Sequence, residues 1–126
     1  MKGRKYAIDV SVESSYVPEQ SSLVDKRFVF SYTVTLFNGG AVSAQLLSRH
    51  WIILDSDGGR QEVRGEGVVG MQPYLKPGES FQYTSGSILH TPAGSMEGSY
   101  QMVADDGATF DAPIPVFALV GPMTLH

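Results

Sequence analysis

The stretch FVFSYTVTL, residues 28–36, decides the fold class of this chain. Large apolar side chains occupy every second position from Phe28 to Leu36, and mostly small polar side chains lie between them. Because successive side chains of an extended chain point to opposite faces, this period of two predicts a β-strand with one buried face.

Outward from this stretch, the same period or a short apolar run marks further segments, and turn residues separate them. The segment around Trp51 is apolar on both faces, as a central strand is, and a tight turn at residues 57–59 follows it. Further strands are expected over residues 6–13, 46–54, 60–66, 81–89, 100–104 and 108–119. About seven short strands predict an all-β fold, an immunoglobulin-like or fibronectin type III-like β-sandwich of antiparallel strands.

Two residue types refine this architecture. Pro113 and Pro115 lack the N–H group that a β-ladder requires, so the last strand is expected to lie at a sheet edge there. Trp51, on the third strand, is expected to be largely buried between the sheets. Its expected neighbours are the aromatic residues Phe30, Tyr32 and Tyr100.

Length and composition indicate one folded domain over residues 1–126. Of the 126 residues, 42% are hydrophobic and 17% are charged, which is enough apolar surface for a core and too little charge for a disordered chain. The formal net charge of −4 argues against a broad basic footprint for nucleic acid. No run of basic residues indicates binding to an anionic membrane.

The absence of cysteine and the character of the N-terminus indicate a cytoplasmic protein. With no cysteine, disulfide bonds, thiolate zinc sites and cysteine nucleophiles are excluded. The basic start at residues 1–5 is not followed by the apolar run of a signal peptide, because Asp9 and Glu13 interrupt it. No stretch approaches the ~20 apolar residues of a membrane span.

The segment GEGVVG, residues 65–70, matches the G-x-G-x-x-G fingerprint of dinucleotide-binding proteins. That fingerprint needs a helix whose N-terminus holds the pyrophosphate, and Pro73 and Pro77 prevent a helix from opening here. Glu66 would also repel phosphate. A glycine-rich loop between two strands is therefore favoured over a nucleotide site.

No residue is assigned to catalysis, to a cofactor or to a metal. His50, His90 and His126 show no metal-ligand spacing, and His50 is expected to be a hydrogen-bonded histidine in the core or at its rim. The chain has no nucleophile elbow, and residues 55–58 resemble the start of an EF-hand loop but lack its later acidic ligands. These observations predict a protein that is not an enzyme.

Several motifs together resemble the ApaG family. They are RHW (49–51), VRGEGVVG (63–70), LKPGE (75–79), YTSG (83–86) and PIPVF (113–117). The resemblance implies a fibronectin-type sandwich in small cytoplasmic bacterial proteins that have no established biochemical activity. It also implies a genetic link to cobalt resistance and magnesium efflux in some members. Similar domains look like protein-interaction modules in eukaryotic F-box proteins and in a polymerase delta-interacting protein.

Two functions from different classes remain open. The first is a protein-binding module with an exposed apolar patch or an open sheet edge, and such an edge would also allow a homodimer. The second is a small-ligand or divalent-ion binding protein, for cobalt or magnesium, which needs oxygen or imidazole ligands converging in a concave pocket. The first is favoured, because no catalytic or metal-ligand spacing occurs.

Strand direction predicts where a partner would bind. Alternate loops of an antiparallel sandwich share one end, so the loop after the second strand, the loop at 65–70 and the turn at 105–107 are expected to meet at one pole. An extra strand between residues 70 and 77 would reverse the strands after it. Residues 67–71 would expose apolar atoms at this pole inside a polar rim. The predicted partner-binding residues are Asn38, Gly39, Arg64, Gly65, Glu66, Gly67, Val68, Val69, Gly70 and Met71.

Overall fold

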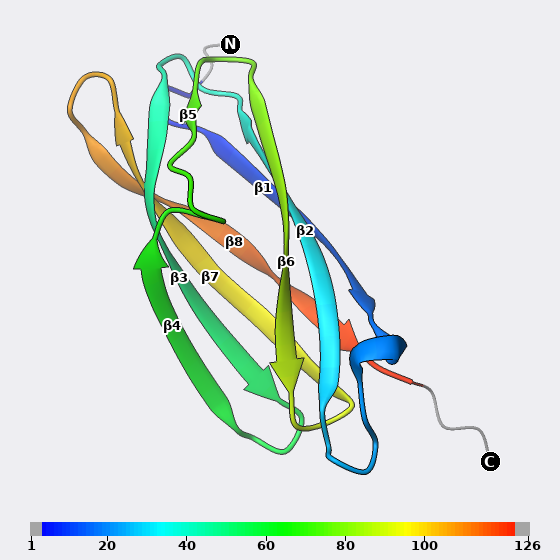
Figure 1. Ribbon diagram of the computed structural model, residues 1–126. Coiled ribbons are helices and arrows are strands. Elements are labelled where there is room, and N and C mark those ends of the chain that lie inside the picture. Colours follow the sequence, from blue (N-terminus) through cyan, green and yellow to red (C-terminus); the bar gives the residue numbers. More distant parts are fainter. Residues whose placement is uncertain (1–3, 123–126) are drawn as a thin grey trace.

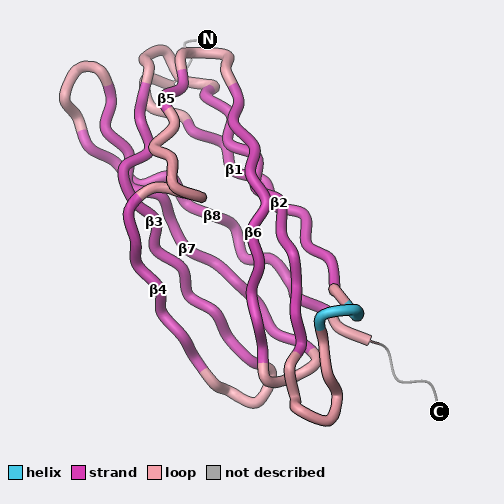
Figure 2. The backbone as a smooth tube through the Cα atoms, in the orientation of Figure 1, coloured by secondary structure: helices cyan, strands magenta, loops and turns pink. Residues whose placement is uncertain are grey.

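The computed structural model describes residues 4–122, and in it two antiparallel β-sheets pack face to face (Figure 1). The elements in chain order are β1 (Ile8–Tyr16), a short 3-10 helix η1 (Pro18–Gln20), β2 (Phe28–Asn38), β3 (Ala44–Asp55), β4 (Arg60–Glu66), β5 (Tyr74–Leu75), β6 (Ser80–Leu89), β7 (Ala93–Ala104) and β8 (Thr109–Val120). Strands and the turns between them make up almost all of the backbone (Figure 2). The predicted all-β sandwich is confirmed.

The two sheets differ in size. The smaller sheet has the strand order β1-β2-β6, and the larger has the order β4-β3-β7-β8, with β5 also paired to β3. Strand β8 lies at an edge of the larger sheet, as Pro113 and Pro115 predict. The strand that the sequence does not predict is β5, because its two residues, between Pro73 and Lys76, are too few to show a period of two.

Strand β5 leaves the direction of the later strands unchanged. Both β4 and β5 pair antiparallel with β3, β4 opposite residues 48–54 and β5 opposite Ala44 and Gln45. Because β5 continues along the same edge in the direction of β4, strands β6 to β8 run as the sequence predicts.

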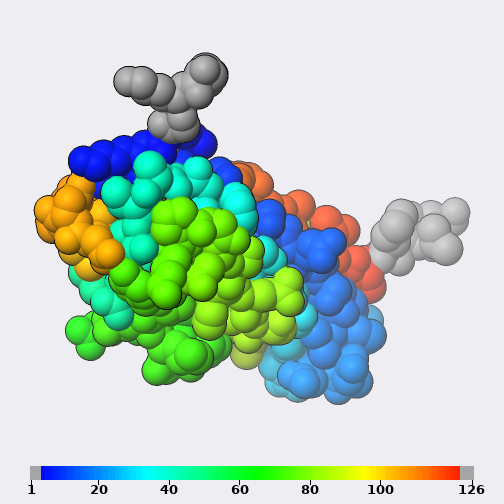
Figure 3. Space-filling model, turned by 90° about the horizontal axis from the view of Figure 1, so that it is seen from above, coloured from blue at the N-terminus to red at the C-terminus, as the bar shows by residue number. Residues whose placement is uncertain are grey.

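Two of the three loops expected at one pole do meet there. The Asp105 N–H in the β7–β8 turn donates to the Ser43 carbonyl in the β2–β3 loop (2.9 Å). The Asp106 carboxylate accepts a hydrogen bond from the Tyr6 hydroxyl (2.5 Å) and pairs with the Lys5 ammonium group (3.0 Å). Seen from this end, the N-terminal segment, the β2–β3 loop and the β7–β8 turn form one surface (Figure 3).

Trp51 lies at the centre of the core with only 3% of its surface exposed, so its predicted burial is confirmed. Its ring makes edge contacts with Tyr32 (centroids 5.4 Å apart) and Tyr100 (6.3 Å), two of the three expected neighbours. The third ring against it is Phe117 (6.0 Å) rather than Phe30, which packs on Tyr16. Aromatic side chains from both sheets therefore interlock around the tryptophan.

Asn38, at the end of β2, joins three segments at the pole. Its side-chain amide donates to the carbonyls of Val42 and Leu75 (2.9 Å each) and accepts from the Gly40 N–H (2.9 Å). Only 1% of Asn38 is exposed. The prediction that its side chain contacts a partner is wrong, because the amide is buried and holds the loops in place.

Candidate functional site

The loop between β4 and β5 carries most of the predicted site, and it lies beside β3 rather than at the pole. The Gly67 N–H donates to the Leu47 carbonyl (2.8 Å), next to the bulge where the pairing of β3 with β7 shifts register. The Gln72 side chain donates to the same carbonyl (2.9 Å). The predicted grouping of this loop with the other two is wrong, because β5 and not the glycine loop continues the edge to the pole.

The tip of the loop is a tight turn. The N–H groups of Val68 and Met71 each donate to the other residue's carbonyl (2.8 Å). Between them, Val69 and Gly70 both have positive φ, 44° and 79°, which a type I′ turn requires at its two central residues. Glycine adopts this conformation freely, whereas valine is strained in it because its branched Cβ crowds the backbone.

The turn directs neighbouring valines in opposite directions. Val68 is 1% exposed and belongs to the hydrophobic core, whereas Val69 is 56% exposed and Met71 is 52% exposed. The predicted apolar surface is therefore present at Val69 and Met71. The prediction that Val68 contributes to it is wrong, because the loop lies over the gap between the sheets and turns this side chain inward.

The predicted site residues divide into two groups. Residues 64–71 form one continuous stretch along the end of β4 and the loop, with Arg64 and Glu66 exposed beside the turn. Asn38 and Gly39 lie at the pole, where the Gly39 N–H donates to the Ala7 carbonyl (2.8 Å). The structure therefore supports the loop as one candidate surface and leaves the pole residues outside it.

Arg49 binds the backbone at the start of the loop, and it is not among the site residues that the sequence predicts. Its guanidinium Nη1 donates to the carbonyls of Glu66 (2.9 Å) and Gly67 (2.8 Å). The guanidinium lies flat against Gly65, where a Cβ atom would come within 2.7 Å of Nη2. The first glycine of the G-x-G-x-x-G pattern thus makes room for Arg49, and the other two have positive φ.

A pocket of about 310 Å³ opens beneath the turn, between the two sheets. It is lined by Tyr32, Arg49, Glu66, Val68, Val69, Gly70, Tyr83 and Ser85. Behind it, the hydroxyls of Tyr83 and Tyr100 form a buried hydrogen bond of 2.5 Å. Burial raises the pKa of Tyr83 to about 12 and raises that of Tyr100 as well. The tyrosines therefore remain neutral hydrogen-bonding groups at physiological pH.

We predict that alkaline pH destabilises the protein through this tyrosine pair. Because the folded-state pKa of Tyr83 is raised above the usual value of 10.0, its stabilising contribution is present below pH 10 and declines as the pH rises toward about 12. The expected slope is about 1.4 kcal/mol per pH unit for each tyrosine. Denaturant titrations across this range should show the decline, and Tyr83→Phe should make it shallower. An identical decline in Tyr83→Phe would contradict the prediction.

The outer face of the larger sheet carries a cluster of polar side chains around His50 and Glu62. His50 Nε2 lies 2.5 Å from Glu62 Oε2, so His50 is hydrogen-bonded as expected, but it lies on the outer face of the sheet and not in the core. The contact with His50 lowers the pKa of the Glu62 carboxyl, and Arg60 lowers it further. Within residues 4–122, no three His, Asp or Glu side chains are arranged to hold a metal ion.

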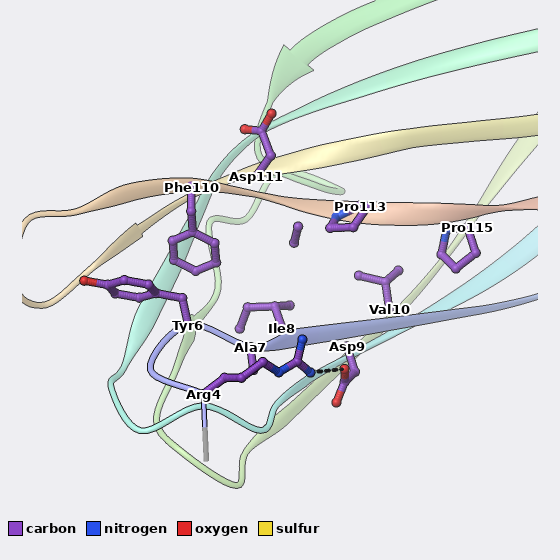
Figure 4. A pocket seen from close by; sticks show the side chains of 11 residues that line it. Arg4, Tyr6, Ala7, Ile8, Asp9, Val10, Phe110, Asp111, Pro113 and Pro115 are labelled. Atoms are coloured by element: carbon purple, nitrogen blue, oxygen red, sulfur yellow. Dashed lines mark ion pairs between the residues drawn. The ribbon is translucent and has the colours of Figure 1, made fainter. Parts of the chain in front are cut away.

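A further pocket, of about 370 Å³, lies between strand β8 and the start of β1 with the segment before it (Figure 4). Tyr6 packs against Phe110 with ring centroids 5.2 Å apart, and Arg4 pairs with Asp9 at 3.8 Å. The Tyr6 hydroxyl is bound to Asp106. Three of the polar side chains that line this pocket, Arg4, Tyr6 and Asp9, are already paired within the molecule, so the glycine loop remains the stronger candidate for partner binding.

The comparisons with known proteins agree with one another. The family model described as the ApaG domain matches residues 18–104. Protein ApaG of Nitrosospira multiformis is 60% identical over 99% of this chain and 98% of its own length. Protein ApaG of Thiobacillus denitrificans is 57% identical over the same shares. The crystal structure of a Bordetella pertussis protein assigned as ApaA superimposes with a TM-score of 0.93 at 50% identity, over 98% of this chain and 100% of that one. In the part of the chain that is described, no helix is long and apolar enough to cross a membrane.

Proposed function

This chain belongs to the ApaG domain family, and we propose that it is a non-enzymatic protein-binding module that contacts its partner through the loop between β4 and β5. The observation that carries this proposal is the conformation of Val69. A branched apolar side chain is held in a left-handed backbone conformation with φ of 44° and is 56% exposed to water. Backbone strain of this kind is concentrated at functional sites.

The surroundings of Val69 supply the other parts of an interface. Met71, which is 52% exposed, adds an adaptable apolar side chain on the same loop. Arg64 and Glu66 lie at the edge of this surface and give it a polar rim. Because the side chain of Val68 anchors the loop in the core, the exposed side chains of the loop are held in fixed positions relative to each other.

Binding of a divalent ion is the alternative that the family resemblance implies. It would need convergent ligands, and the described residues contain no such cluster of His, Asp or Glu. No observation therefore favours divalent-ion binding over partner binding at the loop.

We predict that Val69→Asn increases the stability of the protein and weakens its binding to the partner. Asparagine tolerates positive φ, so the variant should be more stable than the parent by about 1 kcal/mol, measured by denaturant unfolding. The same change removes an exposed apolar side chain from the proposed interface and should weaken partner binding about tenfold. If the free energy of unfolding of Val69→Asn were equal to or lower than that of the parent, the inference that Val69 is strained would be wrong.

The partner needed for this measurement can be obtained by photocrosslinking. A photoreactive residue at position 69 should capture a protein that the same residue at position 116 does not. Val116 is the matched control because it is 61% exposed and lies on β8, away from the loop. The captured protein is then titrated against the parent, Val69→Asn and Val116→Asn. Equal capture at both positions, or equal affinities for all three proteins, would refute the proposed surface.

A further inference from the structure

Strand β4 is one of the two edge strands of the larger sheet, opposite the edge formed by β8 (Figure 1). Residues 60–64 are all exposed, because the larger sheet extends beyond the three-stranded sheet on this side. Among the described residues, β3 is its only partner strand. An edge strand of seven residues presents a row of backbone donors and acceptors that a further strand can pair with.

The even-numbered residues of β4 direct their peptide groups toward this open edge. At the lower end of the ladder the Asp55 N–H donates to the Gly59 carbonyl, and at the upper end the Gly67 N–H donates to the Leu47 carbonyl. Because hydrogen-bonded residues alternate along an antiparallel ladder, the odd-numbered residues of β4 bond to β3. The even-numbered residues therefore remain available for a second strand.

The same even-numbered positions carry all the charges of the strand. Their order is Arg60, Glu62, Arg64, Glu66. Within one molecule, Glu62 pairs with the arginines on either side at 3.3 Å and 3.1 Å. The alternation of sign also makes the strand complementary to itself. When a second copy of β4 runs antiparallel to the first, positive side chains can face negative side chains along the whole strand.

One register of such a pair matches every charge. When Val63 lies opposite Val63 of the second copy, each Arg60 faces a Glu66 and each Glu62 faces an Arg64. A register with Glu62 or Arg64 on the twofold axis would place like charges opposite each other, which is destabilising. A register with Gln61 or Gly65 on the axis would keep only half of the opposite-charge pairs.

From this pattern we infer that β4 is the interface of a symmetric homodimer, in which two β4 strands pair antiparallel about Val63 and join the larger sheets of the two copies. The occupant of this edge is a second copy of the chain, because its charge sequence is complementary to itself. Charged edge strands usually deter pairing with arbitrary strands. Here the charges favour one partner in one register, which gives specificity.

Val63 completes the contact at the twofold axis. It is 38% exposed and is paired with Trp51 of β3, so its side chain lies on the core-facing side of the sheet. In the proposed register the two Val63 residues form a pair without mutual hydrogen bonds, with Cα atoms about 4.5 Å apart. Their side chains then bury apolar surface against each other.

The first test exchanges charges at the outer pair. We expect the parent to show a monomer–dimer equilibrium at about 10 µM to 1 mM by sedimentation, in the range of weak interfaces. Arg60→Glu and Glu66→Arg should each weaken self-association about tenfold or more, because each places two like-charge pairs across the interface. An equimolar mixture of the two variants should associate as the parent does, because opposite charges again face each other. Glu13→Arg, an equal charge change on β1, should leave association unchanged.

The second test reads the register directly and uses the absence of cysteine from the chain. Val63→Cys should form a disulfide-linked dimer under mild oxidation, because the Cα separation suits a disulfide. Gln61→Cys is the matched control, since its two copies would lie roughly 13 Å apart along the strands. A parent that stays monomeric over the whole range, failure of the mixture to restore association, or equal crosslinking at positions 61 and 63 would overturn the inference. Val69→Asn should not change self-association, so the two proposals fail independently.

Discussion

Replacing Trp51 with alanine should lower the free energy of unfolding by about 3–5 kcal/mol, the usual range for removing a buried tryptophan. Trp51 is 3% exposed and touches the rings of Tyr32, Tyr100 and Phe117. These rings come from both sheets, so the cavity left by alanine would open between the sheets, and it could close only if the two sheets moved toward each other. Since small domains have total stabilities of about 5–15 kcal/mol, the variant should be marginally folded or unfolded.

Thermal and denaturant unfolding monitored by circular dichroism measure this effect. Trp51→Phe is the matched control, because it keeps an aromatic ring in the core and should lose clearly less stability than Trp51→Ala. A melting temperature for Trp51→Ala within a few degrees of the parent would contradict the central position of this residue.

The second large effect is expected from Gly67→Ala. Gly67 has φ of 63°, and a Cβ atom there would collide with the backbone carbonyl of Met71, which cannot rotate away as a side chain could. The left-handed conformation costs alanine about 1–2 kcal/mol, and forcing an atom into a packed site costs about 1–3 kcal/mol more. We expect a loss of about 2–5 kcal/mol in the free energy of unfolding and displacement of the Val68–Met71 turn.

Gly70→Ala separates these two causes. Gly70 also has positive φ, 79°, but a Cβ atom there meets nothing within 4 Å. Only the conformational cost remains, so this variant should lose about 1–2 kcal/mol in denaturant unfolding. Equal losses at positions 67 and 70 would mean that the close approach to Met71 does not limit the loop.

The parts of the fold that the sequence predicts are those in which one face of a strand is buried. Residues 28–36 show this plainly, because the core side of β2 is apolar at every second position and the other side is mostly Ser and Thr. Strand β5 shows nothing comparable, since a two-residue strand held by Ala44 and Gln45 has no period. Its existence depends on pairing with β3, which is a tertiary contact.

The candidate site was less predictable for the same physical reason. Val68 and Val69 are identical in chemistry and adjacent in sequence, and only the turn geometry decides that one enters the core and the other faces water. The role of Arg49 depends on two carbonyls that come close only when the loop folds back on β3. Asn38 resembles a surface turn residue in the sequence, whereas its amide is buried and donates to the carbonyl of Leu75, which is distant in the chain.

The anchoring of the loop by Val68 has a consequence for binding thermodynamics. A loop that is free in solution loses conformational entropy when a partner orders it, and this loss reduces the affinity. Here the Val68–Met71 turn is closed by its own hydrogen bonds and fastened through a core side chain before any partner arrives. The loop is therefore preorganised, so association should involve little ordering of the backbone, and the amide protons of Val68 and Met71 should already be protected from exchange in the free protein.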